Sequence, residues 1–168
     1  MANFTFLKDK PEFSDFANDC IEAEESFEKS PNACVKLVRS AFEASVKWLY
    51  SRDKKFKSSS NDFFALISNK TFENAVGQSL LSKIHYCRKL GNQALHNEKD
   101  FNVEEGVRCL SNLFDFVQWI DKRYSKNYQP RRFNAEDIPV EESFWAKAAK
   151  YAGVGLLGAL AAFFITKK

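Results

Sequence analysis

The stretch "HYCRKLGNQALHNEKDF" (residues 85–101) decides the fold of this chain. It holds both histidines of the sequence, and its apolar residues recur at the spacing of one face of a helix. A glycine at position 91, inside that pattern, costs a helix about 1 kcal/mol relative to alanine. The best explanation for such a glycine is the close approach of a second helix, so the stretch predicts helix-on-helix packing.

The same periodicity extends on both sides of this stretch. Ser30-Pro31 is typical of a helix start, with Ser30 as the N-cap and Pro31 as the first helical residue. We see no run of strict alternation, which leaves an all-α domain over residues 1–124. The helices that we predict run from about 11 to 29, 31 to 51, 79 to 97 and 103 to 124, with a short one near 61–69 capped by Asn61 or Asp62.

Charge and cysteine content narrow the function classes. Residues 143–168 contain four lysines and no acid, which leaves 21 basic and 22 acidic residues in residues 1–142. A domain that is nearly neutral disfavours broad binding to a phosphate backbone, and hence a role on DNA. The four cysteines lack metal-ligand spacing, so we predict buried thiols, with no metal and no cofactor. The positions are Cys20, Cys34, Cys87 and Cys109.

The C-terminal quarter predicts a linker and a membrane anchor. Residues 125–142 have mixed charge and no periodicity, as a linker would. Within residues 143–168, the nineteen residues 148–166 contain only Lys150 as a charge and would span roughly 28 Å as a helix, close to the hydrocarbon thickness. A buried C-terminal core helix is the alternative. Interfacial aromatics and lysines, and a stripe of small residues typical of helix association in lipid, support the anchor; they include Trp145, Lys147, Lys150, Tyr151, Gly155 and Ala159.

Together these features predict a single-pass protein with a cytoplasmic N-terminal domain. The basic residues near the anchor, among them Arg131 and Arg132, favour the cytoplasmic side. The expected partners are the lipid bilayer, a second copy in a homodimer or higher homo-oligomer, and a further protein.

The polar residues of the opening stretch lie in one helical register. Arg88, Asn92 and His96 are spaced four apart. A structural interpretation has Asn92 and His96 bonding to neighbouring helices or capping the next turn, and Arg88 meeting the carboxylate of Glu43. Arg39 and Glu43 form an i, i+4 pair that is also compatible with a solvated salt bridge.

These residues carry a family resemblance. "CRKLGNQALHN" resembles the Arg-x-x-Gly-Asn-x-x-x-His signature of a helical domain of unknown function, found in motor subunits of type I restriction endonucleases and in small bacterial proteins. Arg88, Gly91, Asn92 and His96 match that signature, and Arg39 and Glu43 stand where the family has an arginine and a glutamate on an earlier helix. The resemblance covers residues 30–124.

The resemblance implies a fold and a setting. This family is similar to the HEPN (higher eukaryotes and prokaryotes nucleotide-binding) helical domains, which are common in defence systems. Catalytic members cleave RNA without metal, as dimers, through an Arg-x(4–6)-His motif. Seven residues separate Arg88 from His96, which places them roughly 12 Å apart along one helix. One chain is therefore poorly suited to place both on one phosphate.

Two functions are expected from these patterns. The first is a bacterial inner-membrane binding or regulatory protein in antiviral defence, with no catalysis. The alternative is a metal-independent ribonuclease in which Arg88 of one protomer works with His96 of the other, with Asn92 beside them, and RNA as the substrate.

Overall fold

The computed structural model describes residues 2–96 and 99–139, and all regular structure within them is helical. The α-helices are α1 (Ser14–Glu25), α2 (Pro31–Arg52), α3 (Phe63–Ile67), α4 (Lys70–Leu95) and α5 (Val103–Tyr124). Short 3-10 helices cover Thr5–Asp9, Pro11–Phe13, Ser26–Glu28 and Ala135–Asp137. The prediction of an all-α domain is confirmed for these residues.

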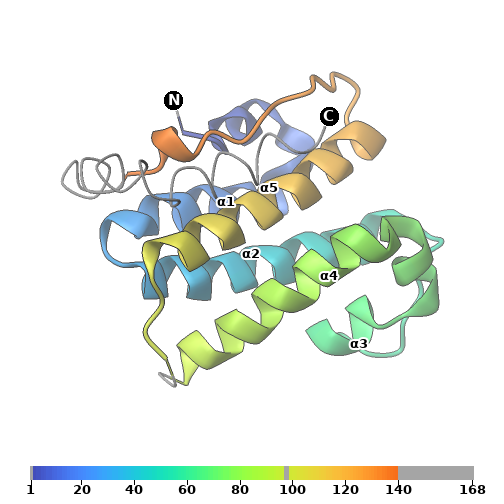
Figure 1. The fold of residues 1–168 in the computed structure, drawn as a ribbon. Coiled ribbons are helices and arrows are strands. Elements are labelled where there is room, and N and C mark those ends of the chain that lie inside the picture. The colour runs from blue at the N-terminus through green and yellow to red at the C-terminus, as the bar shows by residue number, and fades with distance from the viewer. Residues whose placement is uncertain (1, 97–98, 140–168) are drawn as a thin grey trace. The chain divides into compact units, whose positions relative to one another are not determined.

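Helix α2 is the centre of the domain, because it packs against α1, α4 and α5 (Figure 1). Aromatic side chains fill the space around it. Phe42 of α2 packs on Phe116 of α5 with ring centroids 5.6 Å apart, and Trp48 makes an edge contact with Phe13 at 5.3 Å. Burying such rings is the main source of stability in a domain of this size. All four cysteines are buried in this core, as predicted.

The helix starts follow from capping chemistry. The Ser30 hydroxyl accepts the Ala33 N–H at the start of α2, and Asp62 caps α3 in the same way. Asn102 and Glu105 form a reciprocal capping box at the start of α5. The predicted starts of α2 and α5 are confirmed, and Asp62 rather than Asn61 caps the short helix.

Helix α4 differs from its prediction at both ends. It begins at Lys70 rather than near residue 79, and a kink at Gly77, where φ is 77°, lies inside it. A glycine adopts this left-handed conformation without steric cost, so the chain bends there and the helix resumes. At the other end the helix stops at Leu95 rather than near residue 97, and the Leu95 side chain is 49% exposed.

Residues 125–138, predicted as the first part of a linker, pack on the domain instead. The compact unit extends to Ile138, which is buried. Phe133 packs on Phe114 of α5 with ring centroids 5.7 Å apart. The Asn134 N–H donates to Asn3 Oδ1 at 2.6 Å, and Asn3 Nδ2 donates to the Asn134 carbonyl at 3.0 Å. We call residues 125–138 the C-terminal strap.

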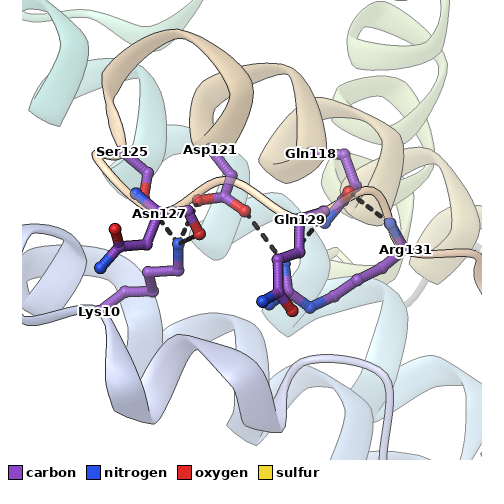
Figure 2. A network of polar contacts seen from close by, with 7 residues as sticks. All are labelled: Lys10, Gln118, Asp121, Ser125, Asn127, Gln129 and Arg131. Atoms are coloured by element: carbon purple, nitrogen blue, oxygen red, sulfur yellow. Dashed lines mark hydrogen bonds and ion pairs between the residues drawn. The ribbon is translucent and has the colours of Figure 1, made fainter.

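A buried ion-pair network fixes the strap, as Figure 2 shows. Asp121 of α5 is fully buried, with Lys10 Nζ 2.9 Å from one carboxylate oxygen and an Arg131 guanidinium nitrogen 3.2 Å from the other. Lys10 Nζ also donates to the Ser125 hydroxyl and to the Asn127 carbonyl. The N-terminal segment and the strap thus meet on one buried carboxylate.

Among residues 2–96 and 99–139, no helix combines the length and the apolar character needed to cross a bilayer. The predicted anchor, residues 143–168, lies outside the described residues, and so do Trp145, Lys147, Lys150, Tyr151, Gly155 and Ala159.

Candidate binding face on α3 and α4

The signature glycine lies where α4 crosses α2. A Cβ added to Gly91 would be 2.3 Å from the Cβ of Arg39 and 2.8 Å from its Cδ. No real Cβ tolerates such distances, so the glycine lets the stem of Arg39 lie directly against the α4 backbone. The prediction that Gly91 marks a tight helix crossing is confirmed.

Arg39 is the polar centre of this crossing. Its Nε donates to Asn92 Oδ1 at 2.7 Å, and its guanidinium forms an ion pair with Glu43 at 3.1 Å. The other Glu43 oxygen accepts from Lys47 Nζ at 2.7 Å. Asn92 therefore bonds to a neighbouring helix, as the structural interpretation expected. Arg39 and Glu43 are part of a tie between helices rather than an isolated surface pair.

Arg88 does not meet Glu43, in contrast to the sequence-based expectation. Its guanidinium carbon lies 4.6 Å from the centre of the Phe64 ring, which comes from α3. Its Nε is buried and has no hydrogen-bond partner among the described residues. Glu43 is already occupied by Arg39 and Lys47, so Arg88 finds its partner in an aromatic face.

His85 lies on the same ring. Its imidazole centroid is 6.2 Å from that of Phe64 in an edge contact. Partial burial, and secondarily the nearby Arg88 charge, lower the pKa of His85 from its ordinary value, while Glu73 acts in the opposite direction. The neutral imidazole is thus the favoured form in the folded domain.

Two large apolar side chains of the described residues are exposed in this region, one on α3 and one at the end of α4. Phe64 is 51% exposed and Leu95 is 49% exposed, and these two are the large hydrophobic residues with the greatest exposure. Residues 85, 88, 92 and 95 follow one another at helical spacing along α4, and α3 packs beside them. We call Phe64, His85, Arg88, Asn92 and Leu95 the α3–α4 face.

The structure brings four of the six predicted residues together and separates the other two. Arg39, Glu43, Gly91 and Asn92 meet at the helix crossing. Arg88 faces Phe64. His96 is the exposed C-cap residue that follows α4, roughly 12 Å further along the helix axis. Phe64 was missed from the sequence, because a five-residue helix gives too short a pattern to assign a face.

Within the described part of the chain, no group of three or more His, Cys, Asp and Glu side chains is placed to hold a metal ion. The buried thiols are also poor ligands and poor nucleophiles. Burial raises the pKa of the Cys20 thiol, and burial likewise raises that of Cys34, so both remain protonated.

Residues 21–133 match a protein family described as a domain of unknown function (DUF4145). That span is more than half of the chain and contains the whole helix crossing. The chain belongs to this family. No curated protein and no solved structure matches the sequence.

The DUF4145 match begins within α1 and ends inside the strap, at residue 133. It therefore extends beyond residues 30–124, which carry the resemblance seen in the sequence motifs. The Asp121–Arg131 ion pair falls inside the matched span, and so do both ends of the Arg39–Asn92 hydrogen bond.

Proposed function

We propose that this DUF4145 domain is a binding module that pairs with a second copy of itself through the α3–α4 face, at the bacterial inner membrane. The observation that carries the proposal is the exposure of Phe64 and Leu95 on either side of a fixed polar tie. Apolar side chains that gather on one face are typical of interaction sites.

The face is self-complementary. Leu95 lies ten positions after His85, a rise of roughly 15 Å along α4. Two α4 helices packed antiparallel about a two-fold axis near residue 90 would set Phe64, beside His85, against Leu95 of the partner subunit. The same axis would set Arg88 opposite Asn92 of the partner subunit. Isologous dimers have this reciprocal arrangement, in which residue i meets residue j and j meets i.

The test is the oligomeric state of the full chain in mild detergent. We expect Phe64→Ser and Leu95→Ser each to weaken self-association at least tenfold in analytical ultracentrifugation. Lys89→Ser, an exposed change on the same helix, should leave it unchanged. A wild-type monomer at every concentration, or an equal effect of all three changes, would reject the pairing.

The membrane tether and the defence setting come from the sequence. Residues 143–168 would hold the domain at the inner membrane, and the HEPN-like resemblance suggests a regulatory role in antiviral defence. Alkaline carbonate extraction tests the tether, because release of the full chain into the supernatant would reject it.

Phage plaque counts on cells carrying the wild type or the Leu95→Ser variant test the role in antiviral defence. Equal counts for these cells and for cells lacking the gene would reject it.

A metal-independent ribonuclease is the second candidate. Two observations favour it: Arg88 forms no ion pair among the described residues, and His96 is exposed. The antiparallel dimer would bring Arg88 within roughly one helical turn of His96 of the partner subunit. Cleavage of RNA by the wild type, lost in both folded Arg88→Ala and His96→Ala variants, would establish it. Activity that is absent from every variant and the wild type, or that survives both changes, would exclude it.

A further inference from the structure

A cavity of about 360 Å³ lies between the end of α2, the loop that follows it and α3. Tyr50, Phe56 and Leu66 form its apolar floor. Lys47 and Lys57 also line the cavity, and no carboxylate does. The Lys47 ammonium is already paired with Glu43 at 2.7 Å, which leaves that of Lys57. Its volume is at the lower end of the range for small-molecule sites.

The surrounding loop concentrates positive charge in a domain that is otherwise nearly neutral. Residues 51–61 read "SRDKKFKSSSN", with four basic residues and one acid, a net charge of +3. That acid, Asp53, already accepts the Tyr124 hydroxyl at 2.7 Å and lies near Lys55. Of the four basic residues of this loop, Lys57 is the one that lines the cavity.

The loop that lines the cavity is held in place, and its side-chain hydrogen-bond donors on Lys57, Ser60 and Asn61 are not used by other contacts among the described residues. Asn69 Nδ2 donates to the Lys57 carbonyl at 3.1 Å, which anchors the loop to the start of α4. Ser60 Oγ accepts the Asp62 N–H, which leaves its own O–H to donate. Neither the Lys57 ammonium nor the Asn61 amide has an ion-pair or hydrogen-bond partner among the described residues, although both line the cavity.

A second cavity provides a contrast within the same domain. It measures about 410 Å³ and is lined by two acids, Asp9 and Glu12, as well as by Lys10 and Lys126. Lys10 is already held by Asp121 there. A site with balanced and committed charges does not select an anion. The first cavity has no carboxylate in its lining and keeps one ammonium, that of Lys57, without an ion-pair partner among the described residues.

We propose that the cavity between α2, the 51–61 loop and α3 binds a phosphate monoester through Lys57, Ser60 and Asn61. A monoester carries a charge of −1.5 to −2 near pH 7 and three acceptor oxygens. The Lys57 ammonium supplies a positive charge, and together with the Ser60 hydroxyl and the Asn61 amide it offers one donor group for each of the three acceptor oxygens. The apolar floor accepts the group that bears the phosphate. The ester belongs either to a soluble metabolite or to a lipid headgroup.

The experiment measures how fast an amine reagent labels individual lysines of the full chain, by mass spectrometry. Glycerol 3-phosphate added to protein in detergent is the soluble arm. Protein in nanodiscs of phosphatidylcholine, with or without phosphatidic acid, is the lipid arm. Bound phosphate should slow the labelling of Lys57 at least threefold and saturably, while Lys54, on the same loop but outside the cavity lining, stays unchanged.

The two arms identify the source of the ester. Protection by glycerol 3-phosphate assigns a soluble ligand, and protection by phosphatidic acid alone assigns a headgroup. Asn61→Ala should raise the half-protecting concentration at least threefold, and Asn74→Ala, an exposed asparagine on α4, should not. Absence of protection in both arms, or equal protection of Lys54 and Lys57, would overturn the proposal.

Discussion

Gly91 and Arg39 set how closely α2 and α4 approach each other. Gly91→Ala would gain about 1 kcal/mol of helix propensity, but its Cβ would fall 2.3 Å from the Arg39 Cβ. The Arg39 Cβ is fixed by the α2 backbone, so the helices must move apart. We expect a net loss of about 1–3 kcal/mol in the free energy of unfolding, as measured by urea denaturation.

Lys89→Ala provides the control for that change. Lys89 is exposed on the same helix, and its replacement should alter stability by less than about 0.5 kcal/mol. If Gly91→Ala were as stable as Lys89→Ala, the crossing of α2 and α4 would have space for the added methyl group, and the prediction would be wrong.

Substitutions of Asn92 test whether the hydrogen bond between α2 and α4 depends on the side-chain oxygen of this residue. Asn92→Ala removes the acceptor for Arg39 Nε and should cost about 1.5–3 kcal/mol, the usual worth of a hydrogen bond to a charged group. Asn92→Asp keeps an oxygen at that place and adds a negative charge beside the guanidinium, so it should recover most of the loss. Thermal unfolding compares the stability of the two variants directly. An equal loss of stability in both would contradict the role of Asn92 Oδ1 as the acceptor for Arg39 Nε.

At the scale of the helix, α4 carries a pH dependence through His85. The folded-state pKa of His85 is lowered, first by burial and then by Arg88, so the unfolded chain binds more protons as the pH falls through about 6.5. Stability contributed by the neutral imidazole is therefore complete above that pH and is lost as the pH falls toward the lowered value.

The measurement is the melting temperature at pH 7.5 and pH 5.5. The melting temperature of the wild type should fall more on acidification than that of His85→Gln, because glutamine takes up no proton. The exposed His96→Gln change serves as the comparison and should follow the wild type. A parallel decline of wild type and His85→Gln would show that His85 does not contribute.

The helices themselves were largely predictable from the sequence. The boundaries of α5 follow from its apolar period and the Asn102 cap, and Ser30-Pro31 places the start of α2. The start of α4 was missed because Gly77 resembles a helix end, whereas its positive φ only bends the chain. The Arg88–Phe64 contact depends on how α3 folds back on α4, which no local pattern encodes.

At the scale of the whole domain, stability depends on the buried Asp121 carboxylate. Asp121→Asn would leave Lys10 buried beside a neutral group and should cost about 3 kcal/mol or more. Asp115→Asn is the control, because Asp115 is exposed and its pair with Lys83 should be worth less than about 1 kcal/mol.

Limited trypsin digestion gives a second reading of the Asp121 change. Loss of the Arg131 ion pair should free the strap and speed cleavage after Arg131 and Arg132. Unchanged cleavage in Asp121→Asn would mean that Phe133 and Ile138 hold the strap without the ion pair.

The strap could not be predicted because nothing in its sequence repeats. Residues 125–138 have no helical or strand period, and many of the contacts that hold them involve residues outside the segment, such as Asn3 and Phe114. A proline and mixed charge are shared by linkers and by packed irregular segments. Only the contacts with other residues distinguish a packed irregular segment from a linker.

The reciprocal hydrogen bonds between Asn3 and Asn134 also matter for protein engineering, because they hold the beginning and the end of the compact domain close together. Because these two positions lie side by side, a short glycine-serine bridge could join residue 2 to residue 138 without distorting the helices. New termini could then open at the exposed Lys54–Lys55 bond. The domain is thus a natural candidate for circular permutation, in which the order of translation changes while every contact of the core is kept.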